Sequence, residues 1–165
     1  MEIRQVRRED DRLAISRVYA ASWREAYREI LPPAYLDSIP EGRWVHTVDD
    51  PEKHTLILLE GGEIVGVSSY CASRFESRAG WGEIVSLYLL PDFWGRGCGA
   101  QLLRAAVEGL RQLGYRDIFL WVLEGNVRAR RFYERSGFQD GHTALDAEIG
   151  GVALREVQYL YRTGQ

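Results

Sequence analysis

The sequence predicts an α/β fold of the α+β type, in which a mixed, mostly antiparallel central sheet is flanked by helices. Two strand-like runs joined only by residues 61–62, both glycine, are too close in sequence to be parallel. Residues 83–137 then alternate strand, helix, strand and helix, which adds a parallel strand pair. Residues 138–161 return to strands around the glycines at 150–151, unlike the regular alternation of a doubly wound fold.

The N-terminal part predicts a short strand followed by helices. Residues 2–6 alternate as a strand does, and Asp10 and Asp11 can each cap a following helix. Residues 32–33, both proline, end that helix, and 34–48 form a shorter helical or irregular piece. The helix that follows Asp10 and Asp11 is predicted to have an apolar face, because residues recur on it at helical spacing: Ile15, Val18, Tyr19, Ser22 and Trp23.

The middle of the chain predicts a hairpin and then a buried strand. Residues 55–60 and 64–72 are the two arms of the hairpin. Residues 83–90 form the buried strand, which Pro91 ends.

A helix, a strand and a second helix follow a glycine-rich loop. Gly114 occupies the position of a C-terminal cap for the first helix, and residues 118–123 predict the next strand. Asn126 can cap the second helix, which runs through Tyr133 and closes at Gly137. The first helix is predicted from an apolar stripe of Leu102, Leu103, Ala106, Val107, Leu110 and Leu113.

Composition narrows the class of protein. A length of 165 residues suits a single domain, predicted to span 1–165. The net charge of −3 argues against nucleic acid or an anionic membrane as the main partner. No run is long enough to span a membrane and the first residues are not a signal peptide, so we expect a cytoplasmic protein. The three histidines lack metal-ligand spacing, and no metal is predicted.

Gly95, Gly97 and Gly99 lie between the buried strand and the amphipathic helix. Glycines let the backbone approach a ligand, and a helix start offers unpaired N–H groups and the positive end of the helix dipole. The combination favours an anion, best a pyrophosphate, with Arg96 adding charge. A tight turn that binds nothing is the alternative, but the flanking strand and helix favour the binding site.

The pyrophosphate could belong to a nicotinamide dinucleotide. Gly95-x-Gly97-x-x-Ala100 fits a loose Rossmann fingerprint, with Glu124 at the end of the next strand. However, residues 91–94 separate the strand from the first glycine, and too few strand-helix units remain for a doubly wound sheet. An NAD(P)-binding oxidoreductase therefore stays an alternative.

Two motifs in this region resemble the GNAT superfamily of N-acetyltransferases. The family loop is Gln/Arg-x-x-Gly-x-Gly/Ala, which the chain matches at Gly97 and Gly99 but not at Trp94, a position that acts mainly through its backbone. The resemblance is specific from about 83 to 138 and implies a GNAT-like acyl-CoA acyltransferase fold. A second similar segment follows at Asn126, Ala129, Phe132, Tyr133, Gly137 and Phe138.

The resemblance implies direct transfer of an acetyl group from acetyl-CoA to a primary amine. The backbone of Leu87, Tyr88 and Leu89 would pair with the pantetheine arm, which requires strands 83–90 and 116–123 to splay apart. Asn126, also a helix cap, would hydrogen-bond the donor near its thioester end, and Phe132 would also contact the donor. The pyrophosphate would bind the backbone amides of Gly95, Arg96, Gly97, Cys98, Gly99 and Ala100.

The resemblance also implies catalytic residues. Tyr133 would act as the general acid that protonates the departing thiolate, although a tyrosine at this spacing also suits a core. Glu83 would act as the general base, directly or through water, unless it faces solvent at the start of its strand. One branch of the family places its base where this chain has Trp121, which cannot serve.

Acceptor specificity in the family comes from the first helices, so Trp23, Tyr27 and Tyr35 are expected to line the acceptor pocket. An aromatic stripe of this kind also suits a plain core. The sequence leaves the acceptor open, as a small molecule or a protein, and a longer acyl donor and a homodimer also remain open. A CoA-binding sensor or interaction module without catalysis is the second alternative.

Overall fold

A computed structural model describes residues 1–163, so the last two residues of the predicted 1–165 domain lie outside the described residues. The described residues form a seven-stranded sheet in the order β1-β2-β3-β4-β5-β7-β6. Only β4 and β5 pair in parallel, which confirms the predicted mixed, mostly antiparallel sheet. The strands are β1 (Glu2–Gln5), β2 (His54–Glu60), β3 (Glu63–Ala72), β4 (Gly82–Leu89), β5 (Asp117–Leu123), β6 (Gln139–Ile149) and β7 (Val152–Arg162).

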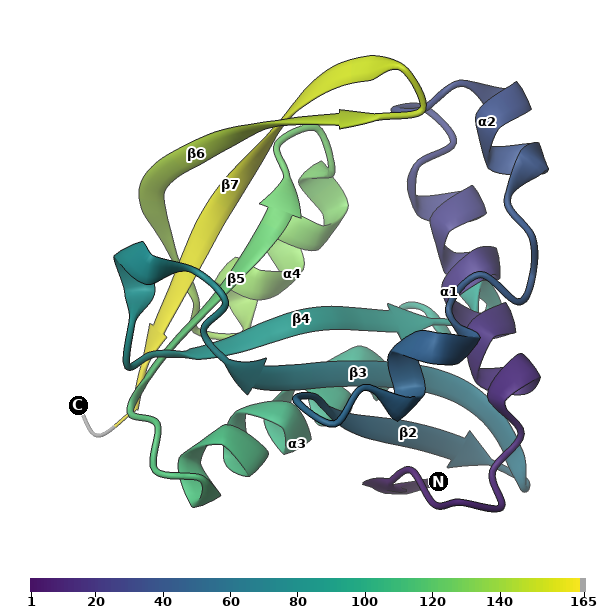
Figure 1. Ribbon diagram of the computed structural model, residues 1–165, viewed down its shortest axis with the longest axis horizontal. Coiled ribbons are helices and arrows are strands. Elements are labelled where there is room, and N and C mark those ends of the chain that lie inside the picture. Colours follow the sequence, from purple (N-terminus) through teal and green to yellow (C-terminus); the bar gives the residue numbers. More distant parts are fainter. Residues whose placement is uncertain (164–165) are drawn as a thin grey trace.

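Helices cover both faces of this sheet (Figure 1). One apolar cluster joins α3 and α4 to β5 and β7 through residues such as Leu102, Tyr133, Leu120 and Tyr159. A second cluster joins α1 to β2 and β3 on the other face. The α-helices are α1 (Arg12–Ala26), α2 (Pro33–Ser38), α3 (Cys98–Gln112) and α4 (Val127–Arg135). No helix within residues 1–163 is long and apolar enough to cross a membrane.

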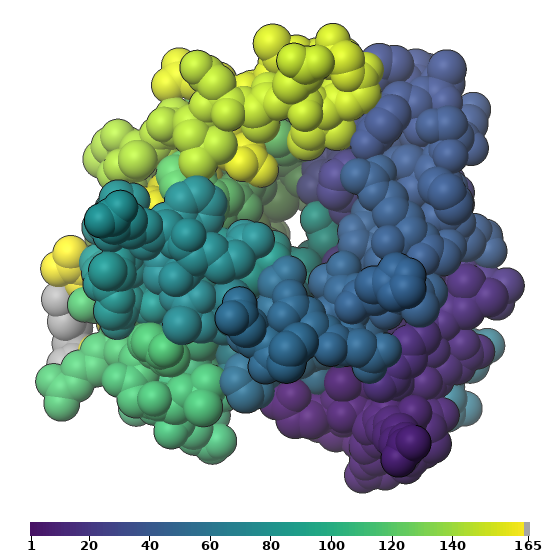
Figure 2. All heavy atoms as spheres, viewed as in Figure 1, coloured from purple at the N-terminus to yellow at the C-terminus, as the bar shows by residue number. Residues whose placement is uncertain are grey.

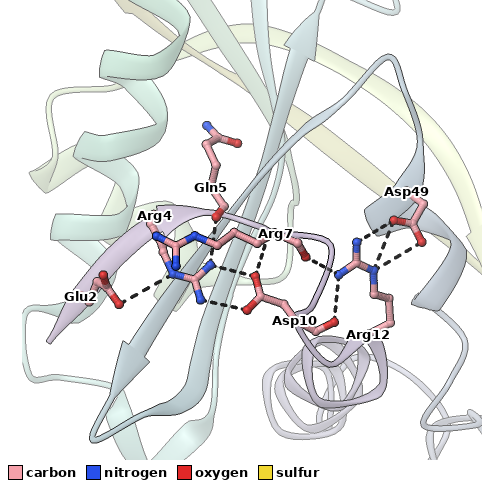
Figure 3. A network of polar contacts seen from close by, with 7 residues as sticks. All are labelled: Glu2, Arg4, Gln5, Arg7, Asp10, Arg12 and Asp49. Atoms are coloured by element: carbon pink, nitrogen blue, oxygen red, sulfur yellow. Dashed lines mark hydrogen bonds and ion pairs between the residues drawn. The ribbon is translucent and has the colours of Figure 1, made fainter.

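Figure 3 shows the polar network that fixes the start of α1 against β1. Of the two predicted caps, Asp11 is the one whose side chain accepts from the first turn of the helix. Asp10 instead accepts two hydrogen bonds of 2.8 Å from Arg4 on β1. Arg12 connects the helix onward to Asp49 at 2.9 Å.

The first helix ends earlier than the sequence predicts. α1 stops at Ala26, and the two prolines lie at the start of α2 rather than at the end of α1. Pro33 is the first residue of α2, where the missing N–H has no partner in any case. Arg24 holds the two helices together by donating to the carbonyl of Ile39 at 2.8 Å.

The centre of the sheet splits between β4 and β5. Their parallel pairing covers only Gly82–Ile84 with Ile118–Leu120. On its other side β4 pairs with β3, but Val85 has no partner there and forms a bulge. A bulge bends its strand, and this one lies directly after the last pair shared with β5. The predicted splaying of these two strands is therefore confirmed.

The β6–β7 hairpin arches over the split towards α2 (Figure 1). Gly150 and Gly151 make its turn, both with positive φ. A Cβ at Gly150 would lie 2.7 Å from the ring of Tyr35 on α2. The hairpin tip and α2 thus touch, and together they roof the space above the split.

Candidate active site

A cavity of about 810 Å³ fills the split between β4 and β5. Figure 2 shows the molecule hollowed near its centre, where the blue segment from α2 onwards, the teal segment after β3 and the yellow β6–β7 hairpin meet. Residues from α1, β4, β5, α4 and β7 and from the glycine loop all line it. Leu87, Tyr88 and Leu89 lie along one wall, on the part of β4 that has left β5.

The glycine loop forms one end of this cavity. Gly95 and Gly97 have φ of 73° and 81°, a region that disfavours any side chain. Gly97 is the residue before α3, and no side chain caps that helix. The N–H groups at the start of α3 are therefore free to bind a ligand. Gly99, Ala100 and Phe132 line the cavity beside them.

The side chains of Arg96 and Cys98 do not line this cavity. The Arg96 guanidinium lies 5.3 Å from the ring centre of Phe93. Cys98 is buried in the apolar cluster beneath the sheet. Buried Cys98 can contribute to the loop only through its backbone, whereas the charge that exposed Arg96 would add stays a prediction.

Two arginines that the sequence analysis did not assign also line this end. The Arg128 guanidinium lies 3.9 Å from the ring centre of Trp94. Arg135 lines the cavity about two helical turns further along α4. Trp94 itself is fixed by a 3.0 Å hydrogen bond from its indole nitrogen to the Leu89 carbonyl. Burial lowers the pKa of Arg128, but an arginine keeps its charge. Residues 128–131 include three arginines, which is a signal in the sequence for Arg128 but not for Arg135, and only the helix phase shows which arginines face the cavity.

The middle of the cavity brings together Asn126 and Tyr133. The Asn126 side chain caps α4 by accepting from the Ala129 amide at 3.2 Å. Tyr133 is 9% exposed and packs against Phe138, yet it also lines the cavity. Burial raises the pKa of Tyr133 well above its usual value, so the hydroxyl keeps its proton at neutral pH.

Glu83 lies in the cavity wall but is closely held. It is 1% exposed, and Arg74 binds both of its oxygens. The guanidinium donates at 2.6 and 3.1 Å, and the backbone N–H of Arg74 donates at 3.1 Å. The carboxylate is therefore buried and paired, and does not face solvent.

The predicted acceptor residues separate in the structure. Trp23 and Tyr27 line the cavity and contact each other edge to face, with ring centres 4.9 Å apart. Tyr35 does not line it. Its hydroxyl accepts from Arg43 at 2.9 Å and its ring covers Gly150. Tyr35 is thus a roof residue behind the cavity wall.

Sequence reasoning missed Glu156, which lies on β7 and lines the cavity opposite β4. Its carboxylate makes no hydrogen bond with another described residue, and burial raises its pKa. A lone glutamate in a strand of unknown register gives no signal in the sequence. Phe75 and Trp121 line the cavity nearby, with ring centres 5.5 Å apart.

Comparisons with known proteins agree on one family. A model of the acetyltransferase (GNAT) family matches residues 14–138. The chain is 32% identical to the uncharacterized N-acetyltransferase YuaI of Bacillus subtilis, covering 94% of this chain and 89% of that protein. It is 38% identical to an aminoalkylphosphonate N-acetyltransferase of Salmonella typhimurium, covering 56% and 61%. The structure of a PaiA N-acetyltransferase from Thermoplasma acidophilum, in complex with coenzyme A, superposes with a TM-score of 0.78 at 20% identity, covering 98% of each chain.

Proposed function

The chain belongs to the GNAT family of acetyltransferases, and on this premise we propose that it transfers an acetyl group from acetyl-CoA directly to a primary amine. One observation carries the proposal: the uncapped start of α3 and the glycine loop line the same cavity as the part of β4 that has left β5. A diphosphate suits such a helix start, and the split leaves a strand edge beside it.

The residues present fit the donor. The amides of 95–100 would hold the pyrophosphate, and Arg128 and Arg135 would add positive charge at the same end. The free edge of Leu87–Leu89 would pair with the amide groups of the pantetheine arm, as a neighbouring strand would. A PaiA relative of this fold binds coenzyme A, which supports the same donor here.

Tyr133 would supply the proton that the departing thiolate needs. Its raised pKa keeps the hydroxyl protonated until the carbon–sulfur bond breaks, and the hydroxyl has no hydrogen-bond partner among the described residues. The attacking nitrogen then returns a proton to Tyr133 as the amide forms. The phenol is thereby restored after each turnover.

The amine also needs a group that takes its first proton. Glu83 is the base that the sequence predicts, but its oxygens already accept three hydrogen bonds from Arg74. In this role Glu83 would reach the amine through a water molecule. The Glu83→Gln variant described below tests whether Glu83 takes a proton during turnover or only pairs with Arg74.

A thiol-release assay with acetyl-CoA and a panel of primary amines tests the proposal, together with calorimetry of coenzyme A binding. We expect coenzyme A to bind, NADH and NADPH not to bind, and at least one amine to release thiol. Tyr133→Phe should lower kcat by about 10²–10⁴-fold with little change in coenzyme A affinity. Binding of coenzyme A without turnover of any amine would favour a sensor module, and no binding would refute the proposal.

A further inference from the structure

Glu156 occupies the same face of the sheet as Glu83, which is paired with Phe119 of β5. Glu156 itself is paired with Leu123 on β5, and Gln158 is paired with Trp121. Residues opposite each other in a ladder point to the same side. The alternating residues Val157 and Tyr159 enter the core beneath the sheet, so the Glu156 side chain opens into the cavity.

The cavity is lined by both basic and acidic side chains, and they differ in whether they have a partner. Arg128 and Arg135 lie at the end of the glycine loop. Among the described residues three carboxylates line the cavity, and two of them have arginine partners: Glu25 lies 3.6 Å from Arg28 and Glu83 lies 2.6 Å from Arg74. Glu156 alone makes no ion pair and no hydrogen bond with another described residue, although Arg74 is near enough to act on its charge. A half-buried carboxylate without a partner is costly, which favours a cationic ligand beside it.

The walls around this carboxylate are aromatic and apolar. Phe75, Trp121, Trp23 and Tyr27 line the cavity together with Leu123 and Ile149. The indole nitrogens of Trp23 and Trp121 are buried and have no hydrogen-bond acceptor among the described residues. Aromatic faces attract an ammonium group and also bind a flat apolar body. The free indole N–H groups suit a ligand that also carries an oxygen acceptor.

This inference rests on the proposed function and names its acceptor. We propose that the acceptor is a monocationic amine carried on an aromatic body, as in an arylalkylamine, and that Glu156 binds its ammonium and takes the first proton. The neutral nitrogen then attacks the thioester carbon, forming the carbon–nitrogen bond as the carbon–sulfur bond breaks. The proton on Glu156 leaves to solvent, and the second proton of the nitrogen restores Tyr133.

The surroundings of Glu156 suit a proton acceptor. Burial raises its pKa most, the negative charge of Glu83 raises it further, and Arg74 opposes both. Tyr27 and Tyr88, the other titratable groups that sense its charge, have raised pKa values and stay neutral. The carboxylate is therefore a stronger base than an exposed one.

The experiment measures thiol release and calorimetric binding to the protein loaded with coenzyme A. The probes are tyramine and phenethylamine, compared with spermidine as a polycation and 2-aminoethylphosphonate as an amine that carries an anion. We expect kcat/KM for tyramine to exceed that for the last two by at least tenfold. The phosphonate probe matters because one relative is named for aminoalkylphosphonates, and Glu156 should repel its anion.

Variants then test the residue itself. Glu156→Gln should raise KM for tyramine at least tenfold, weaken its binding to the same extent and leave coenzyme A affinity within twofold. Glu156→Asp should recover part of the loss. Glu148→Gln makes the same charge change at an exposed position on β6, outside the cavity lining, and should leave tyramine turnover unchanged.

The outcomes separate the two proposals. If coenzyme A does not bind, the proposed function itself fails. If coenzyme A binds but Glu156→Gln leaves both KM and tyramine binding unchanged, or if spermidine or the phosphonate is preferred, only this inference is overturned. A loss of turnover in Glu83→Gln with none in Glu156→Gln returns the proton-accepting role to Glu83.

Discussion

The buried ion pair between Glu83 and Arg74 gives the sharpest test of stability in the cavity wall. Arg74→Ala would remove both guanidinium hydrogen bonds and leave one from the backbone N–H at 3.1 Å. Glu83 is 1% exposed, so water cannot easily replace the lost partner. The variant therefore leaves a buried carboxylate with most of its compensation gone.

The cost follows from the bonds that are lost. A hydrogen bond to a charged group contributes about 1.5–3 kcal/mol. The side chain of Arg74 is 47% exposed, which places each bond at the low end because water screens the pair. We therefore expect Arg74→Ala to lower the free energy of unfolding by about 3 kcal/mol.

Urea denaturation at pH 7 measures this loss. The double variant Arg74→Ala, Glu83→Gln should be more stable than Arg74→Ala alone, because it removes the unpaired charge. Arg28→Ala serves as a control at an exposed pair, where we expect a change below about 0.5 kcal/mol. A loss below about 1 kcal/mol for Arg74→Ala, or no recovery in the double variant, would refute the reasoning.

Three further predictions address the loop, the N-terminal network and the packing of α3. Gly97→Ala, which forces a side chain onto a φ of 81°, should weaken coenzyme A binding at least tenfold by calorimetry, whereas Gly62→Ala at a φ of 86° in a hairpin turn should not. Asp10 has a pKa lowered from 3.8 to about 2, so its stabilisation is present above pH 3.8 and is lost as the pH falls towards 2. Asp10→Asn should cost about 1 kcal/mol at pH 7, and acid titration of unfolding should show the difference from wild type shrinking in that window. Gly109→Ala would place a Cβ 2.5 Å from the Tyr70 ring, and urea denaturation should show a loss of about 1–3 kcal/mol; no loss would mean that the ring moves freely.

Local pattern predicted most elements of the fold because periodicity and turn residues act within a few positions. The hairpin at Gly61-Gly62, the α3 stripe and the cap at Asn126 are of this kind. The choice between Asp10 and Asp11 was not predictable, because it depends on Arg4 of another element. The end of α1 before the prolines was missed for a similar reason, since proline suits a helix start as well as a helix end.

The candidate site was predictable only where a motif carried it. The glycine loop and Tyr133 belong to motifs, and both line the cavity. Arg74, Glu156 and the roof contact of Tyr35 depend on strand order and register, which a single sequence does not encode locally. β7 lies between β5 and β6, and the β6–β7 register shifts between Asp140 and Ala144. Counting residues from the hairpin turn pairs Glu156 with Leu145, but it does not show that Glu156 also pairs with Leu123 of β5 beside the cavity.

The bulge at Val85 adds one residue to β4, and the split in the sheet depends on this extra residue. Because Ile84 and Ser86 already pair with adjacent residues of β3, deleting this one residue would restore continuous pairing and leave every other side chain of β4 on its present face. Without the bulge, β4 would be straight and could continue its pairing with β5 beyond Ile84, so that the two strands would close the cavity between them. A deletion at position 85 should thus abolish ligand binding by closing the cavity, although it removes no predicted contact residue.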